Sequence, residues 1–274
     1  MKIVETFAKK HLHLLRRISQ IGSVILIIAI PLLNKTGIHF IKGTYYSISI
    51  GELDIIDPTV ALQMILLTKN LLISVLLMMT VPIILALIFG KVFCSWACPF
   101  NFFAELLGKI RKSSYRPNRN PKTHIYWSVY SVIILLMTVF GVPLVTYISM
   151  PGQISAQIAD VIFTGVIGIE ILLIIIILTG EFIFNRNLWC KYICPVGATL
   201  SLFRTKRTLK IVYDPTKCAS CSNKKESPCN LACPMNLNPR LNGIYPYCYN
   251  CFECVNICQE NGKALKISSG LQKK

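Results

Sequence analysis

The sequence predicts an α-helical membrane protein with four transmembrane helices, arranged as two hairpins, and a small α+β, cysteine-rich domain at its C-terminal end. Three observations predict this fold class. The 274 residues are 53% hydrophobic, the apolar residues gather into four long runs, and eight of the twelve cysteines lie after residue 217. The formal net charge of +17 could also indicate nucleic-acid binding. Because the basic residues flank the apolar runs, where membrane topology accounts for them, we expect no nucleic-acid partner.

The first two apolar runs, residues 18–34 and 70–90, predict the first hairpin. The second run contains no charged residue between Lys69 and Lys91, and about 20 helical residues cross a hydrocarbon core of about 30 Å. The first run is shorter but continues into further apolar residues. Residues 1–17 precede it without a signal-peptide cleavage pattern, so we expect the first helix to be retained.

The third and fourth runs predict the second hairpin. Residues 125–159 contain no charge, which is too long for one helix, and we expect the third span to end near Ser149, before Pro151. The fourth span occupies residues 161–184 and includes Glu170. The sequence therefore predicts four membrane crossings.

Lysine and arginine residues predict the orientation. Of 29 such residues, 26 fall on one side of the predicted spans, and three, Lys35, Lys42 and Lys69, fall between the first two spans. Cytoplasmic segments retain most lysine and arginine, so both termini are predicted to be cytoplasmic. The predicted domains are an N-terminal segment (1–17), a transmembrane domain (18–204) and a C-terminal cytoplasmic domain (205–274).

Two four-cysteine motifs fill the C-terminal domain. The first reads C-x2-C-x7-C-x3-C-P and the second C-x2-C-x2-C-x3-C. The bacterial ferredoxin run is C-x2-C-x2-C-x3-C-P, in which three cysteines hold one iron–sulfur cluster and the fourth ligates the other. Because cytoplasmic thiols stay reduced, disulfides are not expected. We therefore predict a ferredoxin-type domain with two [4Fe–4S] clusters. The predicted iron ligands are Cys218, Cys221, Cys229 and Cys258 for one cluster, and Cys248, Cys251, Cys254 and Cys233 for the other.

The ferredoxin pattern is not followed at every position. The first motif has five extra residues between its second and third cysteines, and Gln259 stands where proline would follow the second motif. The alternative interpretation is two structural zinc sites of four thiolates each. Zinc sites usually pair two C-x2-C units at a wider separation, and the C-x3-C tails have no place in that scheme. The spacing therefore favours iron over zinc.

The other four cysteines form two matching C-x3-C-P motifs, at residues 94–99 and 190–195, each after an apolar run at the predicted cytoplasmic surface. The match predicts two hairpins of related design that lie side by side. Their thiols could bind a third cluster, exchange as a redox disulfide or hold a transient metal; the alternative is a packing motif with free thiols. Two matching motifs favour a redox or ligand role. The cysteines concerned are Cys94, Cys98, Cys190 and Cys194.

Four spans, a C-x3-C-P motif after the second and the fourth, and a double four-cysteine tail together resemble the NapH/MauN group of ferredoxin-type membrane proteins. Residues 41–63 and the joint GKVFCSWACPFN resemble its NapH branch in particular. The resemblance implies a multi-pass protein of the bacterial inner membrane that serves as the quinol dehydrogenase component of a periplasmic nitrate reductase system. It implies partners in the quinone pool, a periplasmic iron–sulfur protein of the NapG type and, indirectly, a nitrate reductase.

Clusters in the cytoplasm could not feed a periplasmic enzyme directly, so electrons must cross the bilayer. We hypothesise that the C-x3-C-P cysteines relay electrons between the C-terminal clusters and membrane quinol. Ionisable residues at membrane depth are functional candidates because they are unfavourable there. Glu170 and His39 are therefore the candidates for taking a proton from quinol. The alternative for Glu170 is a hydrogen bond to Thr or Ser of a neighbouring helix, or residence in the neutral form.

Other functions stay open at this point. An assembly or metal-reducing factor like the cytochrome oxidase accessory proteins has similar C-x3-C-P helices but carries a further folded domain. An iron–sulfur redox sensor would need an output domain. The sequence shows neither a Gly-rich phosphate loop beside a strand nor a catalytic triad pattern. We therefore expect an electron-transfer subunit of a quinol dehydrogenase rather than a complete enzyme.

Overall fold

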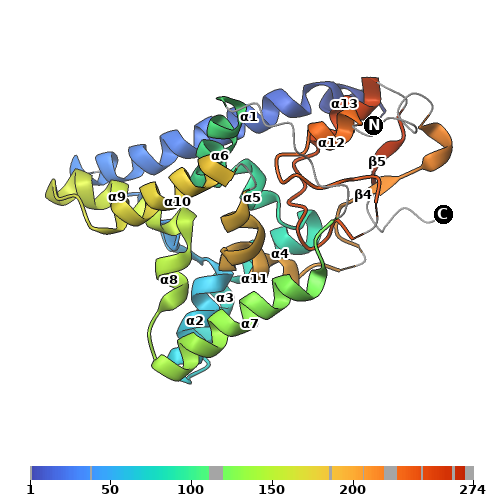
Figure 1. The fold of residues 1–274 in the computed structure, drawn as a ribbon. Helices are drawn as coiled ribbons and strands as arrows, with labels where there is room; N and C mark the ends of the chain where they lie inside the picture. The colour runs from blue at the N-terminus through green and yellow to red at the C-terminus, as the bar shows by residue number, and fades with distance from the viewer. Residues whose placement is uncertain are drawn as a thin grey trace.

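The computed structural model of the chain describes residues 2–37, 39–110, 120–184, 187–205, 207–218, 227–241, 243–260 and 263–268. These residues are mostly helical, with one three-stranded and one two-stranded sheet. One group of helices surrounds α1 and another surrounds α7, and short helices that carry the C-x3-C-P cysteines lie between the two groups (Figure 1).

The first half of the chain begins with α1 (Lys2–Lys35). An antiparallel sheet follows, made of β1 (Ile41–Thr44), β2 (Ser47–Ile50) and β3 (Leu53–Ile56). After α2 (Pro58–Thr68) the chain returns through α3 (Ile73–Met78) and α4 (Thr80–Phe89). The half ends with α5 (Val92–Trp96) and α6 (Pro99–Ile110).

The second half repeats this order. Its elements are α7 (Thr123–Phe140), α8 (Leu144–Ile148), α9 (Met150–Thr164), α10 (Glu170–Phe184), the short π-helix η1 (Trp189–Ile193) and α11 (Pro195–Leu202). Each half begins with a long helix, continues through a shorter helix and ends that helix at a residue in the left-handed conformation. The chain then returns, passes the cysteine pair and enters a helix that begins with proline. The turn residues are Lys69, at φ 56°, and Gly165, at φ 70°. The two halves are therefore a structural duplication.

The two halves interlock. Helix α9 packs on α1, and α6 contacts both α9 and α10. Correspondingly, α11 packs on α2, α4 and α7. The helices that follow the two cysteine pairs therefore reach across to the opposite half, and both C-x3-C-P motifs come to the centre of the molecule.

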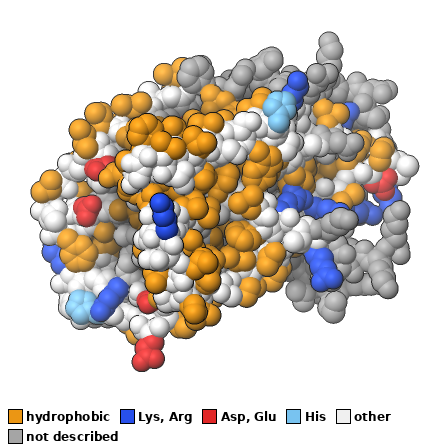
Figure 2. Space-filling view, turned by 90° about the horizontal axis from the view of Figure 1, so that it is seen from below, with side chains coloured by type: hydrophobic (Ala, Val, Ile, Leu, Met, Phe, Trp, Pro, Cys, Tyr) orange, Lys and Arg blue, Asp and Glu red, His pale blue; other side chains and the backbone are white. Residues whose placement is uncertain are grey.

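The surface of this body is apolar. Among the described residues, two helices are long and apolar enough to cross a membrane, Leu12–Lys35 within α1 and Thr123–Phe140. Large hydrophobic side chains are exposed along α1, α4, α7 and α10, and such side chains cover much of the face seen in Figure 2. A surface of this kind is expected for a protein surrounded by lipid. The four crossings and the cytoplasmic side of the termini stay predictions.

Two predicted spans differ from the helices observed. Helix α7 ends at Phe140, well before Ser149, because Gly141 adopts φ 65° and closes the helix. The prediction of one continuous helix over residues 161–184 is wrong, because Gly165 ends α9 and α10 begins only at Glu170. Hydropathy could not reveal either break, since both glycines lie within uncharged, largely apolar runs.

The C-terminal domain has the predicted α+β form. Strand β4 (Lys210–Tyr213) pairs with β5 (Leu265–Ser268) in antiparallel register. The 3-10 turn η2 (Pro215–Lys217), α12 (Pro228–Leu231) and α13 (Glu253–Glu260) lie between the strands in sequence. The Asn250 side chain donates to the carbonyl of Phe89 at 2.9 Å, and the Leu209 N–H donates to that of Ile88 at 3.0 Å. These bonds attach the domain to the end of α4.

Candidate functional site

Each C-x3-C-P motif forms a turn that leads into a helix. Cys94 lies in α5, and Cys98 precedes the proline that opens α6. Cys190 lies in η1, and Cys194 is the N-cap residue of α11, which also opens with proline. Proline suits the first helical position because its missing N–H would have no partner within the helix. The motif therefore places its second cysteine at a helix N-terminus in both halves.

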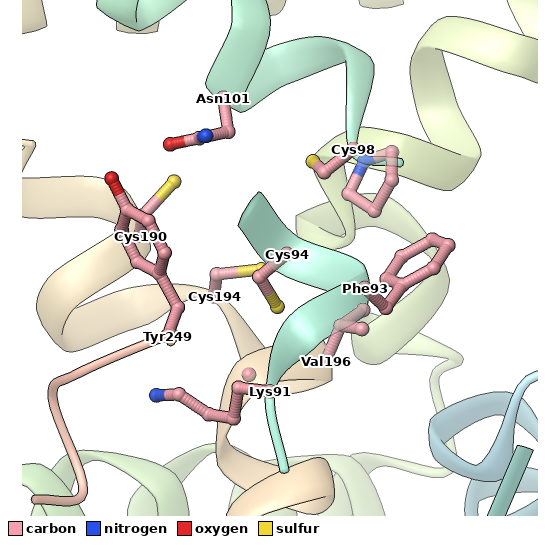
Figure 3. Close-up of a pocket in the computed structure, with 11 residues that line it drawn as sticks. Lys91, Phe93, Cys94, Cys98, Asn101, Cys190, Cys194, Val196 and Tyr249 are labelled. Atoms are coloured by element: carbon pink, nitrogen blue, oxygen red, sulfur yellow. The ribbon is translucent and has the colours of Figure 1, made fainter. Parts of the chain in front are cut away.

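The four thiols line a single cavity between the two halves, the thiol cavity (Figure 3). Its volume is about 20 Å³, close to what one water molecule needs. Within the described part of the chain, no three Cys, His, Asp or Glu side chains converge as ligands of a single metal ion. Thiols spaced around a cavity are better suited to the corners of a polynuclear cluster. Lys91, Phe93, Asn101, Pro151, Val196, Gly197 and Tyr249 complete the lining.

Burial governs the protonation of these thiols in the metal-free chain. It raises the pKa of Cys94 to about 12, and the charge of Lys91 opposes this effect. Burial also raises the pKa of Cys98 and of Cys190 well above the ordinary value. At Cys194 burial raises the pKa, while backbone N–H groups in the first turn of α11 lower it. The thiols are therefore protonated at neutral pH, and metal binding would release protons.

A group of C-terminal cysteines, the inner cysteine set, lies beside the thiol cavity. The inner cysteine set consists of Cys233, Cys248, Cys251 and Cys254. Cys233, Cys248 and Cys251 pack in the same cluster of buried tyrosine rings as Cys94 and Cys190. Charge interactions join Cys254 to the other three members. Tyr249, between Cys248 and Cys251 in sequence, lines the thiol cavity. Tyr249 therefore adjoins both groups of cysteines.

Basic side chains surround the inner cysteine set. They are the buried Arg16, Lys91 and Lys191 and the half-buried Arg204. Their charges act on the thiols of Cys233, Cys248 and Cys251. At Cys233, burial raises the pKa to about 11, and the charge of Lys191 opposes the shift. A cluster held by four thiolates is anionic, so buried positive charges of this kind would stabilise it.

The remaining cysteines, Cys218, Cys221, Cys229 and Cys258, form the outer cysteine set. Cys221 lies outside the described residues, and the other three line a second cavity of about 10 Å³. The Leu265 N–H donates to Cys258 Sγ at 3.2 Å. Cys258 comes from the second motif and joins the first, whereas Cys233 does the reverse. The structure thus brings the described cysteines together in the crossed grouping that bacterial ferredoxins use.

A buried ion-pair network joins α1, α6 and the loop of the inner cysteine set. Arg16 donates to Glu253 Oε1 at 2.7 Å and pairs with Glu105. The Tyr249 hydroxyl also donates to Glu105, at 3.2 Å, and Asn101 does so at 2.9 Å. Sequence reasoning missed this network because it counted Arg16 among the charges that set topology. The one available signal was Glu105, a carboxylate in an apolar segment directly after the first C-x3-C-P motif.

The two residues proposed for quinol contact lie away from the thiol cavity lining. Glu170 opens α10 and accepts a hydrogen bond from Gln157 Nε2 at 3.2 Å. The bond comes from a neighbouring helix, as the alternative for Glu170 expected, but its donor is a glutamine and not a threonine or serine. His39 lies before β1, with its Nδ1 3.2 Å from Asn34 Oδ1, and lines a larger cavity of about 430 Å³.

Comparison with known families gives a match that follows the duplication. The sequence profile of a 4Fe-4S binding domain matches residues 71–117 and 164–211. Each matched segment contains one returning chain and one C-x3-C-P motif. The profile therefore covers the two centres of the duplicated halves and not the cysteine-rich tail. No solved structure matches the chain.

Three relatives extend over most of the chain. An uncharacterized protein of Methanocaldococcus jannaschii is 31% identical over 205 residues, which cover 72% of this chain and 79% of that protein. The ferredoxin-type protein NapH of Haemophilus influenzae is 25% identical over 93% of this chain and 88% of its own length. The methylamine utilization ferredoxin-type protein MauN of Methylobacillus flagellatus is 27% identical over 69% of this chain and 64% of its own length. By these matches and its duplicated C-x3-C-P motifs, the chain belongs to the NapH/MauN family of ferredoxin-type electron-transport proteins.

Proposed function

We propose that the protein is a membrane electron carrier in which the thiol cavity and the inner cysteine set are neighbouring redox centres. One observation carries this proposal. Four thiols from two motifs far apart in sequence line one cavity, and Tyr249 adjoins both that cavity and the inner cysteine set. A packing motif would not require four thiols around a shared cavity. A relay does require two redox centres in close succession.

The cofactors proposed are iron–sulfur clusters, which supply one-electron transfer. The inner and outer cysteine sets would each hold a [4Fe–4S] cluster, and the thiol cavity would hold a third centre. The donor chemistry of the described residues fits this assignment, because each group brings three or four cysteine thiols together. Backbone N–H groups directed at Cys233 and Cys258 support it further, since such donors stabilise cluster sulfurs.

In the proposed role, electrons come from quinol in the bacterial inner membrane, which the chain crosses four times with both termini in the cytoplasm. They leave toward a periplasmic reductase through an iron–sulfur partner of the NapG type. The resemblance to NapH supports a nitrate reductase as the final acceptor, and the family supports ferredoxin-type electron transport. On this view the chain acts as a subunit of a quinol dehydrogenase.

The first test is the metal content of the anaerobically purified protein. About eight irons with matching sulfide would indicate two [4Fe–4S] clusters, and about ten to twelve would add a centre in the thiol cavity. Electron paramagnetic resonance of the reduced protein would identify the clusters. Zinc with little iron would overturn the proposal and favour a structural scaffold.

The second test is the relay itself. The double variant Cys94→Ser and Cys98→Ser should lose the iron of the thiol cavity and stop quinol-dependent reduction of the C-terminal clusters. Those clusters should still form and be reduced by dithionite. The matched variant Cys190→Ser and Cys194→Ser should behave in the same way, because the two motifs share one cavity. Unchanged quinol-dependent reduction in both variants would contradict a relay at these cysteines.

A further inference from the structure

The cavity beside His39 is a pocket that the sequence did not reveal. Its volume is about 430 Å³, and its walls come from the end of α1, from β1 and from the end of α9. Asn34, His39, Lys42 and Thr44 supply polar groups, and Ala159 and Phe163 supply an apolar wall. Ligand pockets commonly enclose about 300–1,000 Å³, mostly apolar with a few placed polar groups. The pocket therefore has the size and composition of a small-molecule site.

The rim of this pocket is exposed and apolar. Phe163, in the pocket wall, is 53% exposed, and Phe40, which follows His39 in sequence, is 67% exposed. Exposed residues of this size in a membrane protein face lipid. A ligand could therefore enter from the bilayer, which favours a molecule with a hydrophobic tail.

The polar groups are held in place for hydrogen bonding. Asn34 Nδ2 donates to the carbonyls of Ile30 and Ile41, at 2.9 and 2.8 Å, which leaves its Oδ1 to meet His39 Nδ1. Among the described residues, His39 has its one hydrogen bond at Nδ1, so Nε2 can meet a ligand hydroxyl. Lys42 adds a positive charge at the same wall.

One residue connects this pocket with the thiol cavity. Thr44 lines the pocket, and the next residue, Tyr45, extends to the first C-x3-C-P motif, where its hydroxyl donates to the Ala97 carbonyl at 3.1 Å. The Tyr45 ring lies 5.6 Å from the ring of Phe93, which lines the thiol cavity. The Tyr45 N–H donates to Ser155 Oγ at 3.0 Å and so fixes the hairpin against α9.

We propose that this pocket binds the headgroup of a quinol from the bilayer, with His39 Nε2 accepting a hydrogen bond from a quinol hydroxyl. The inference rests on the electron-carrier function proposed above and assigns its donor site. Oxidation would convert quinol to quinone with loss of two protons and two electrons. One proton would leave through His39 and the other to the water at the outer surface. The electrons would pass singly, by way of Tyr45, to the iron–sulfur centre proposed in the thiol cavity.

Binding can be measured without turnover. The probe is 2-heptyl-4-hydroxyquinoline N-oxide, a fluorescent quinol analogue, titrated into the full chain in nanodiscs. His39→Leu should weaken binding on the order of tenfold, because one hydrogen bond is lost. Ala159→Phe should weaken it at least as much by filling the pocket. His124→Leu, at the start of α7 and away from this pocket, should leave the Kd unchanged. Equal binding by all four proteins would overturn the site.

A second measurement separates this inference from the proposed function. Tyr45→Leu should retain analogue binding but slow the reduction of the clusters by menadiol, while dithionite reduces them fully. If the protein carries its iron and menadiol reduces it equally well in His39→Leu, Ala159→Phe and Tyr45→Leu, this pocket is wrong and the carrier function stands. If the purified protein lacks iron–sulfur clusters, the carrier function fails whatever the analogue does.

Discussion

The inner and outer cysteine sets contain the same ligands in mirrored motifs, but their surroundings differ. The inner set lies among the buried tyrosines beside the thiol cavity, with the charges of Arg16, Lys91, Lys191 and Arg204 directed at it. The described residues that line the outer cavity are apolar apart from Tyr213 and the thiols, and none is basic. The outer set lies beside β4 and β5, whose residues Tyr213 and Leu265 line the same cavity.

This difference indicates that equal ligands need not give equal potentials. Reduction adds a negative charge to a cluster, and a buried positive charge stabilises that form. We therefore expect the inner site to have the higher reduction potential. On this view, basic side chains outside the C-terminal domain raise the reduction potential of the inner site. The outer site is largely independent of them.

Removing one cluster at a time should show the largest functional difference between the inner and outer sites. Cys251→Ser should remove the inner cluster, about four irons, and stop menadiol from reducing the outer cluster, because the inner set is the one adjoining the thiol cavity. Cys229→Ser should remove a similar amount of iron but leave the inner cluster reducible by menadiol. Iron analysis and paramagnetic resonance after rapid freezing would measure both. Rapid reduction of the outer cluster in Cys251→Ser would refute the order of the sites.

The ion-pair network should make the inner side the more sensitive to mutation. Arg16→Met breaks the buried ion pairs with Glu105 and Glu253 and leaves Glu105 paired with Arg17 alone, at 3.1 Å, so we expect a loss of about 3 kcal/mol. Adding Glu105→Gln to that variant should restore much of the stability. Near the outer set, Lys217→Met removes an exposed pair with Asp214 and should change stability by less than about 0.5 kcal/mol. Denaturant unfolding in detergent would compare the variants; similar losses for Arg16→Met and Lys217→Met would contradict the comparison.

Electrochemistry can measure directly how nearby positive charges change the reduction potential of each cluster. Arg204 is half-buried, and its charge acts on Cys248, so Arg204→Met should lower the potential of the inner cluster by about 50–100 mV. Lys217 directly precedes Cys218 but is half exposed, so Lys217→Met should shift the outer potential by less than about 20 mV. Redox titration followed by paramagnetic resonance resolves both clusters. A larger shift at the outer cluster would show that burial does not decide the coupling.

Features of the two sites that depend on residues close together in sequence could be predicted from the sequence, and features that depend on distant residues could not. The grouping of Cys258 with Cys218 and Cys229 could be predicted, because motif spacing alone proposes it. The convergence of Cys94 and Cys194 was foreseen only as two hairpins side by side. Their shared cavity depends on the interlocking of α6 and α11 with the opposite halves, which no local pattern specifies.

Other features were hidden because they depend on partners distant in sequence. The pairing of Arg16 with Glu105 joins residues that are 89 positions apart, and each residue alone has an ordinary explanation. The helix breaks at Gly141 and Gly165 were missed because hydropathy counts a glycine within an apolar run as part of the span. His39 was proposed from its residue type, but its pocket is formed only where α9 packs against β1.

The smallest expected effect compares two aspartates, Asp57 before α2 and Asp214 before η2. Asp57 caps α2 by accepting the Thr59 N–H at 2.8 Å, and burial raises its pKa. Asp214, before the outer set, accepts from the side chain and the N–H of Thr216, and these bonds lower its pKa. The two carboxylates should therefore give opposite dependences of stability on pH.

The signs follow from the unfolded value near pH 4. For Asp57 the unfavourable charge is absent below that value and develops as the pH rises through its raised folded-state pKa. Asp57→Asn keeps a capping oxygen, so it should stabilise the protein by about 0.5 kcal/mol at pH 7 and by less at pH 4. For Asp214 the favourable contribution is present above the unfolded value and is lost as the pH falls, so Asp214→Asn should destabilise slightly at pH 7 and converge with the parent in acid. Unfolding midpoints at both pH values would measure this. Parallel pH profiles for the two variants would mean that Asp57 is as well solvated as Asp214.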